Sequence, residues 1–242
     1  MRKHCAGFGL IELMVAILLG LIILLGVLQI FVSAKNTYLA QNASAAMQED
    51  ARYALSKMVQ EIRMVGMFGC VETVTPDATA ADFIAAQVSP ITYVTTTVGT
   101  VTTGTLTLIT GDVGSSTTPT WTILTDCVTS PSTVSAGAKT ATGMIALPIR
   151  KVIYTYNSTT QQLLTVSGTT QSVLISNVAA MSVLFGMAAD TSVGSPITSY
   201  TATPASAANI RSVRITLTLS DPNGRVANQT FNVVAAIRNR LP

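Results

Sequence analysis

The sequence predicts an α+β fold in which a long N-terminal helix packs on an antiparallel β-sheet head. Three observations predict it. An apolar stretch at residues 8–32 runs into a helix-periodic amphipathic stretch, and no proline occurs before Pro76. The C-terminal half consists of short segments in which apolar and polar residues alternate, as in strands with one buried face. A chain of 242 residues can hold one such head and an appended helix.

The apolar stretch at residues 8–32 is long enough to cross a bilayer. It reads FGLIELMVAILLGLIILLGVLQIFV, and Glu12 is its only ionisable side chain. About 20 apolar residues span a membrane as a helix, whereas the apolar part of a secretory signal has only about 7–15. Arg2 and Lys3 precede the span, so the positive-inside rule predicts a cytoplasmic N-terminus with the remaining chain across the membrane.

The helix is predicted to continue as an amphipathic segment beyond the membrane. Apolar residues recur at steps of four and three, forming one face that should pack on the head: Ala51, Leu55, Met58, Ile62 and Val65. Charged residues lie mostly on the remaining surface. Lys57 and Glu61 are spaced as an i,i+4 ion pair and are expected to pair with each other on the exposed face.

The positions of proline and glycine predict where this helix ends and where it could kink. A continuous helix over residues 8–65 would be about 87 Å long. Gly66 and Gly69 are expected to end it, because glycine is favoured just past helix ends. Any kink in the membrane segment is expected at Gly20 or Gly26, since no proline is present there.

A threonine-rich region follows the helix, with no Lys or Arg between Arg63 and Lys139. Its five carboxylates make a cation-binding loop one alternative, but their spacing does not match an EF-hand. Solvated loops between short strands are favoured. The predicted strands of this region are Ile91–Val98, Thr105–Thr110 and Trp121–Thr125.

The C-terminal half is predicted to supply the more regular strands, ending in a hairpin around residues 221–224, Asp-Pro-Asn-Gly. Asp221 and Asn223 carry oxygens of the kind that calcium prefers, but a turn role is favoured. In the hairpin, Val213, Ile215, Leu217 and Leu219 should form one apolar face and Phe231, Val233, Ala235 and Ile237 a second. The predicted strands are Val152–Asn157, Gln162–Val166, Ser172–Ile175, Asn177–Gly186, Val213–Ser220 and Ala227–Ile237.

Composition and rare residues exclude several classes of function. Only 10% of residues are charged and the net charge is +3, so the clustered Lys and Arg of a nucleic-acid binder are absent. The only histidine is His4, and the cysteines are Cys5, Cys70 and Cys127. If the extreme N-terminus is removed, the remaining chain has no histidine and two cysteines, and neither a Ser-His-Asp arrangement nor a zinc site can be assembled from it. No catalytic residue, metal or cofactor is therefore expected.

The N-terminus resembles the prepilin signal of type IV pilins and pseudopilins. The residues that carry this resemblance are Gly7-Phe8-Gly9-Leu10-Ile11-Glu12-Leu13, after a short basic leader and before an apolar run. The resemblance implies cleavage between Gly7 and Phe8 by a prepilin peptidase, N-methylation of Phe8, and pairing of Glu12 with the Phe8 amine of a neighbouring subunit. Such a cation would offset the desolvation of Glu12 in an apolar filament core.

Further segments resemble PilW-type minor pilins, with the J-type pseudopilin of type II secretion as the nearest alternative. They include Asp50-x-Arg52-Tyr53-Ala54-Leu55, the Phe68-Gly69-Cys70 run after the helix, and the ending Ile237-Arg238-Asn239-Arg240. The resemblance implies a type IV pilin-like fold divided into a leader at 1–7, a transmembrane or filament-core helix at 8–32, an amphipathic helix at 33–69 and a β-rich head at 70–242.

The function that this resemblance implies is structural. A minor pilin would sit in the inner membrane with its head in the periplasm and then join a pilus, supporting motility and adhesion. Its partners would be major and minor pilins, a tip adhesin, the prepilin peptidase and the inner-membrane assembly platform. The alternative from a different class is a periplasmic binding or hydrolytic domain held by an uncleaved signal anchor.

This membrane topology predicts the redox state of each cysteine. Cys5 would leave with the leader, whereas Cys70 and Cys127 would face an oxidising periplasm, where paired thiols form disulfides. A Cys70–Cys127 bridge is therefore expected, the alternative being two free buried thiols.

Overall fold

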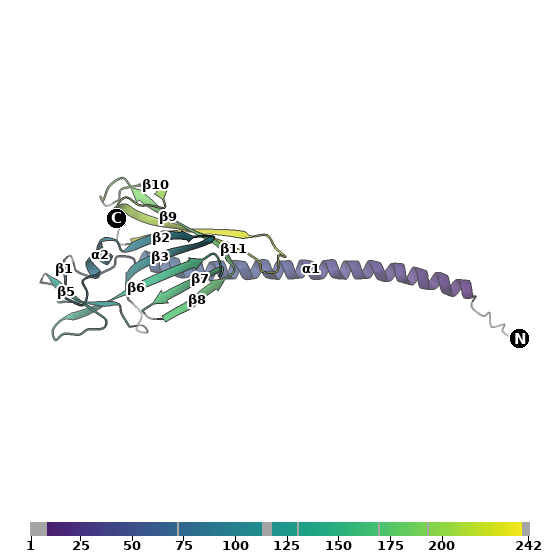
Figure 1. The fold of residues 1–242 in the computed structure, drawn as a ribbon, viewed down its shortest axis with the longest axis horizontal. Coiled ribbons are helices and arrows are strands. Elements are labelled where there is room, and N and C mark those ends of the chain that lie inside the picture. Colours follow the sequence, from purple (N-terminus) through teal and green to yellow (C-terminus); the bar gives the residue numbers. More distant parts are fainter. Residues whose placement is uncertain are drawn as a thin grey trace.

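A computed structural model describes residues 9–71, 73–112, 118–129, 131–168, 170–192 and 194–238. One long helix, α1 (Leu10–Arg63, 54 residues), projects from a β-rich head (Figure 1). The α+β class expected from the sequence is confirmed. The expected first helical residue, Phe8, lies outside the described residues, and the helix begins after the extended Gly9.

Helix α1 runs unbroken through Gly20 and Gly26. Its end agrees with the expected glycine stop. Gly66 and Gly69 have φ angles of +74° and +81°, a left-handed conformation that glycine adopts without a steric penalty. The Gly66 N–H donates to the Ile109 carbonyl at 3.0 Å, which fixes the end of the helix to the head.

The head contains every strand expected from the sequence, several of them longer than expected. The elements that sequence periodicity missed are β1 (Val74–Pro76), α2 (Phe83–Val88), β5 (Ser132–Ala136), β10 (Ile197–Thr201) and a 3-10 helix, η1 (Ala207–Asn209). They have three to six residues, and segments this short carry at most a weak periodic signal. The expected strands are β2 (Ile91–Val98), β3 (Val101–Gly111), β4 (Trp121–Thr125), β6 (Ile145–Asn157), β7 (Gln162–Ser167), β8 (Thr170–Ser176), β9 (Val178–Ala188), β11 (Ile210–Leu219) and β12 (Gln229–Ala236).

These strands form two sheets. The eight-stranded sheet has the order β1-β5-β4-β6-β3-β2, and β7 and β8 extend it from β6. Strand β6 is long enough to pair with β4 through residues 145–149 and with β7 through residues 152–157. The four-stranded sheet has the order β10-β9-β11-β12. All pairings are antiparallel except the short one between β1 and β5.

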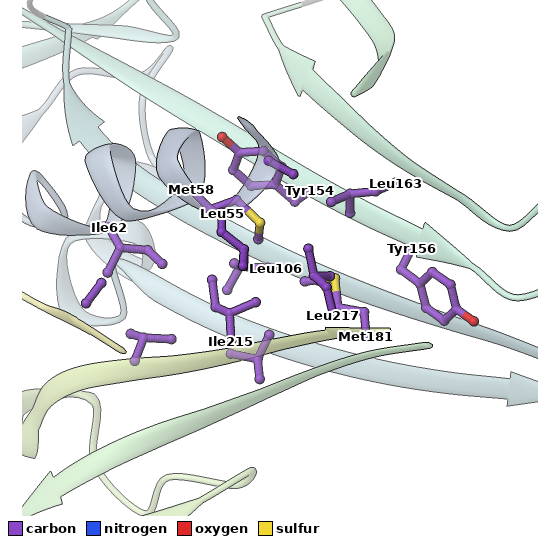
Figure 2. Packing of buried hydrophobic residues seen from close by; sticks show 14 of the residues in the cluster. Leu55, Met58, Ile62, Leu106, Tyr154, Tyr156, Leu163, Met181, Ile215 and Leu217 are labelled. Carbon is purple, nitrogen blue, oxygen red and sulfur yellow. The ribbon is translucent and has the colours of Figure 1, made fainter. Parts of the chain in front are cut away.

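The second half of α1 and both sheets share one core (Figure 2). The five residues of the expected apolar helix face are all buried. They meet Leu106, Tyr154 and Leu163 of the eight-stranded sheet and Ile215 and Leu217 of the four-stranded sheet. Because burial of apolar area is the main stabilising term in folding, the amphipathic half of α1 is an integral part of the head.

Two tyrosines and one left-handed residue join the sheets. The hydroxyl of Tyr156 on β6 donates to the Ala179 carbonyl of β9 at 2.6 Å, and that of Tyr93 on β2 donates to the Met181 carbonyl at 3.3 Å. Asn177, with φ +60°, links β8 to β9 and so carries the chain between the sheets.

The expected Lys57–Glu61 ion pair is wrong. Glu61 is buried, and its carboxylate accepts two hydrogen bonds from Arg150 Nη2 on β6, at 2.8 and 3.0 Å. The physical reason is the width of the buried face of α1, which extends past the apolar stripe and includes Glu61. Burial raises the pKa of the neighbouring Tyr154, and the Glu61 carboxylate adds to the rise.

A second, smaller core lies at the far end of the head, around Trp121 on β4. Phe83 packs edge-on against Trp121 and Phe68, with ring centroids 5.5 and 5.6 Å away. The indole N–H of Trp121 donates to Asp82 at 3.1 Å. Helix α2 is therefore held by aromatic packing that has no periodic signature in the sequence.

Candidate anchoring and assembly site

The first half of α1 presents an apolar surface that no described part of the chain covers. Its most apolar 18-residue window has a mean hydropathy of 3.0 and none of it is buried. Leu10 is 79% exposed and Leu28, among the least exposed of its large apolar side chains, is 48% exposed. An apolar helix of this length is stable in lipid or among other apolar helices, and not in water.

Glu12 lies in the first turn of α1. Its Oε2 accepts a hydrogen bond from the Gly9 N–H at 2.9 Å, so the carboxylate is turned toward the N-terminus of the helix. A negative charge there interacts favourably with the helix dipole. The proposed cleavage and methylation residues, Gly7 and Phe8, lie outside the described residues. The carboxylate is therefore directed toward the end of the chain where cleavage after Gly7 would create a new amine.

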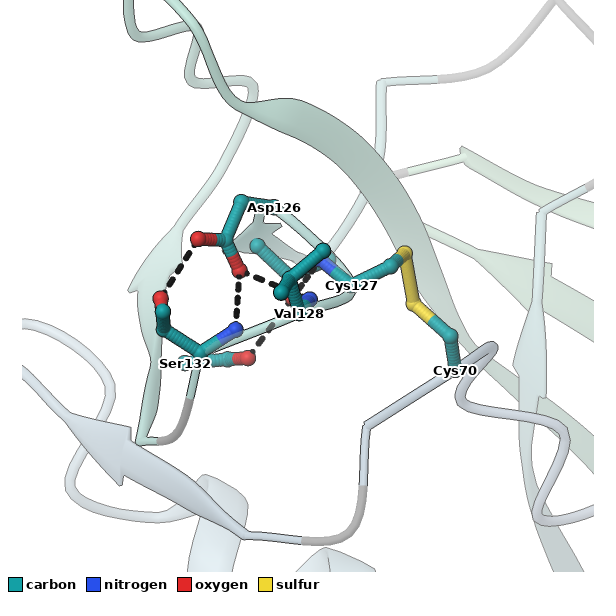
Figure 3. Close-up of a disulfide and its surroundings, with 7 residues drawn as sticks. Cys70, Asp126, Cys127, Val128 and Ser132 are labelled. Atoms are coloured by element: carbon teal, nitrogen blue, oxygen red, sulfur yellow. Dashed lines mark hydrogen bonds between the residues drawn. A yellow bond between two sulfur atoms is a disulfide. The ribbon is translucent and has the colours of Figure 1, made fainter.

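The structure joins Cys70 and Cys127 in a disulfide, as expected from the sequence (Figure 3). The two Cα atoms are 5.6 Å apart and the residues are separated by 57 positions. The bridge connects the segment just after α1 to the segment just after β4. Cys127 has a φ of +59°, and its N–H donates to Thr125 Oγ1 at 3.0 Å. Both cysteines lie at the surface.

Asp126 organises the turn next to the disulfide. Its carboxylate accepts a hydrogen bond from the Thr129 hydroxyl and others from the N–H groups of Val128 and Thr129, at 2.9 and 2.8 Å. These hydrogen bonds, the Thr129 hydroxyl first among them, lower the pKa of Asp126 to about 2. The ionised carboxylate thus stabilises the turn that carries Cys127.

We expect the Asp126 turn to weaken in acid. A carboxyl group whose pKa is lowered on folding stabilises the folded state above its unfolded pKa, and this contribution is lost as the pH falls through the folded pKa. For Asp126 the window runs from about pH 4 down to about pH 2. In Asp126→Asn, the acid-induced loss of stability between these values should be smaller than in the wild type, as measured by urea unfolding at each pH. An identical pH dependence in the two proteins would contradict the assignment.

The favoured turn role of Asp221 is supported by its contacts. Its Oδ2 accepts from the Arg225 N–H at 2.7 Å and its Oδ1 accepts from the Asn223 N–H at 3.2 Å. Gly224 closes the turn with a φ of +64°. In the described ranges, no three His, Cys, Asp or Glu residues gather in a way that would hold a metal ion.

Comparison with known proteins identifies the N-terminal segment. A family model described as the prokaryotic N-terminal methylation motif matches residues 2–28. No curated protein and no solved structure matches the chain. The matched region includes the basic leader, the Gly7–Phe8 junction and Glu12. This prepilin-type motif, which opens a long apolar helix, indicates a protein of the type IV pilin or pseudopilin kind.

Sequence reasoning missed one surface feature that the fold assembles. Arg52 and Arg63 lie three turns apart on α1, and Arg238 follows β12; all three line one groove. The only signal in the sequence is the helical spacing of the two helix residues, because the position of Arg238 beside them depends on how β12 packs against α1.

Proposed function

We propose that the protein is a non-enzymatic minor pilin of the PilW type that takes part in type IV pilus assembly. The observation that carries the proposal is the methylation motif at residues 2–28 on a helix whose first half is uncovered and whose second half belongs to the head core. One rigid helix thereby connects a membrane or filament-core segment to a folded head. Such a subunit acts by packing, and it needs no chemistry of its own.

The proposed sequence of events begins in the inner membrane, with the N-terminus cytoplasmic and the head periplasmic. The prepilin peptidase cleaves after Gly7 and the Phe8 amine is methylated. The inner-membrane platform then moves the apolar helix from lipid into a bundle of pilin helices, in a priming or tip complex that includes other minor pilins, major pilins and a tip adhesin. Glu12 meets the Phe8 amine of a neighbouring subunit, which sets the register of the two helices.

Processing is tested on the N-terminus of the mature protein. We expect mass spectrometry of the protein from its native membrane to find N-methyl-Phe8, and Gly7→Ala to leave the leader attached. Conversion of Gly9 to alanine is the matched control, because that glycine lies outside the cleaved bond. An intact Met1, or a cut beyond Val32, would contradict the proposal and favour a signal-anchored binding or hydrolytic domain.

Incorporation is tested at Glu12. We expect Glu12→Ala to be processed normally but to enter filaments at least about tenfold less well, because the neighbouring Phe8 amine then lacks its counter-charge in an apolar environment. The measurement is the amount of subunit in sheared pili relative to the membrane. Glu49→Ala, which removes an exposed carboxylate from the same helix, is the control. Normal incorporation of Glu12→Ala would refute the pairing.

The J-type pseudopilin of type II secretion has the same N-terminal motif and is the alternative within the class. The two roles can be distinguished by deleting the gene that encodes the protein. Loss of surface pili with normal secretion supports the minor pilin, whereas loss of secretion with normal piliation supports the pseudopilin.

A further inference from the structure

An open groove of about 680 Å³ runs between α1 and the edge strand β12. Its floor is apolar, formed by Leu55 and Val59 of the helix and Val233 of the strand, while three arginines lie along its rim: Arg52, Arg63 and Arg238. Grooves of this composition are suited to peptide segments, because the floor takes an apolar side chain and the rim takes acidic ones.

Strand β12 lies beside α1 near both of its ends. Near one end of β12, Gln229 Nε2 donates to Ser44 Oγ at 2.7 Å. Near the other end, Arg238 and Arg63 line the groove together. Strand β12 pairs only with β11 in the described part of the sheet, so its outer edge has no strand partner there. Unpaired backbone groups on an edge strand are available to another extended chain.

No described acidic residue compensates the charge of the groove. In the ranges that the structure describes, the one ion pair joins Arg150 to Glu61, on a different part of the molecule. None of the three rim arginines has an acidic partner in these ranges. Three like charges around one groove repel each other, and an incoming pair of carboxylates would remove that repulsion while forming charge-assisted hydrogen bonds.

The length of the groove sets the pattern of the occupant. Arg52 and Arg63 are 11 residues apart on the helix, which is about 16 Å. In an extended chain the first, third and fifth side chains share one face and span about 13 Å, and the flexible arginine side chains close the remaining few ångströms. The matching segment therefore has an acidic residue, an apolar residue and an acidic residue at every second position.

Two other sources of negative charge fit less well. Arg52 lies 20 residues beyond Val32 on an unbroken helix, so a lipid headgroup at the end of the membrane span would be about 30 Å away along the helix axis. A nucleic-acid backbone has phosphates, but it provides no apolar side chain for Leu55, Val59 and Val233.

We propose that this groove binds an extended acidic–apolar–acidic segment of another assembly protein, laid alongside β12 with its carboxylates on Arg52 and on the Arg63–Arg238 end. The proposal deepens the proposed assembly function and rests on it for the identity of the partner class. The groove orients a partner on the periplasmic head, whereas the Glu12 site acts inside the membrane or filament core.

The test uses the detergent-solubilised full chain and a fluorescent peptide containing Glu-Thr-Val-Thr-Glu, followed by anisotropy. We expect saturable binding that weakens with salt and is about tenfold weaker in Arg52→Gln/Arg63→Gln, since two charge-assisted contacts are lost. The peptide Gln-Thr-Val-Thr-Gln should bind as weakly. Lys139→Gln/Arg225→Gln, which removes the same charge from exposed sites outside the groove, should bind like the wild type.

Several results would overturn the proposal. Equal binding of the two peptides would show that the carboxylates are not recognised. Unchanged peptide affinity in the Arg52→Gln/Arg63→Gln protein, with an unfolding curve that matches the wild type, would show that the two arginines do not bind the peptide. If duplex DNA displaces the fluorescent peptide at a lower concentration than the unlabelled peptide does, the groove would be assigned to nucleic acid. Self-association lost in the same variant would assign it to a second copy. Processing at Gly7 and incorporation through Glu12 are measured separately, so failure of the groove and failure of the proposed function are distinguishable.

Discussion

Replacing both Cys70 and Cys127 with serine is expected to lower the free energy of unfolding of the head by about 4 kcal/mol, the chain-entropy value for a loop of 57 residues. The loop closed by the bridge includes β1, α2, β2, β3 and β4. Without the bridge, the unfolded chain gains freedom, while the folded head keeps its aromatic contacts around Trp121. For a head of this size we expect a loss of about 10 °C in Tm.

The single tryptophan gives a selective probe for this experiment. Trp121 is buried in the small core beside Phe83 and is the only tryptophan of the chain, so its fluorescence in urea follows the head without interference from the membrane helix. The oxidised wild type and the same protein treated with reductant form the matched pair, and the Cys70→Ser/Cys127→Ser protein treated with reductant is the control, because its unfolding should not change. Equal migration with and without reductant, with two alkylatable thiols after unfolding, would show that the bridge does not form.

Removing one partner of the Glu61–Arg150 pair is expected to cost about 3–5 kcal/mol, as for other buried ion pairs. The side chains of Glu61 and Arg150 are only 8% and 17% exposed. In Glu61→Ala, the guanidinium of Arg150 would stay between α1 and β6 with no counter-charge, and water would reach it only if the helix moved away. The loss of stability in Glu61→Ala therefore comes more from leaving the charge of Arg150 buried without a partner than from losing the attraction between the two side chains.

A double variant separates these two causes. Glu61→Leu/Arg150→Met removes both charges and fills the space with apolar atoms, so we expect it to recover most of the stability lost in Glu61→Ala. Trp121 fluorescence in urea again provides the measurement. Glu49→Ala, an exposed carboxylate on the same helix, should stay within about 0.5 kcal/mol of the wild type. A loss in Glu61→Ala no larger than that of Glu49→Ala would contradict the pair.

Local patterns predicted much of this fold. The apolar run and the Ala51–Val65 stripe predicted a long helix with two environments, and both halves are as expected in the structure. Alternation predicted β11 and its buried face, and residues 221–224 predicted the hairpin turn. These sequence patterns are reliable because each one is formed by residues within a single helix, strand or turn. The three-residue β1 has no such signal, since it exists only through its pairing with β5.

In the candidate site, too, features that arise within one element were predicted from the sequence, and features that depend on contacts between elements were not. The methylation motif and the Glu12 position are read from consecutive residues, and the cysteine pairing followed from compartment and number. By contrast, periodicity placed Glu61 on the solvent face of α1, beside Lys57. The structure places it against β6, because two sheets cover a wider arc of the helix than one apolar stripe indicates.

The apolar N-terminal helix with its prepilin-type signal, the amphipathic continuation and the antiparallel head can all be predicted from the sequence, because each of these depends on neighbours within a few residues. Which charged side chains meet depends on the packing of elements that are far apart in the sequence. Glu61 and Arg150 are 89 positions apart, and Arg238 reaches the Arg52–Arg63 face only because β12 lies along α1. Electrostatic partners are set by distance in space, and periodicity along one element carries no information about the element that packs against it.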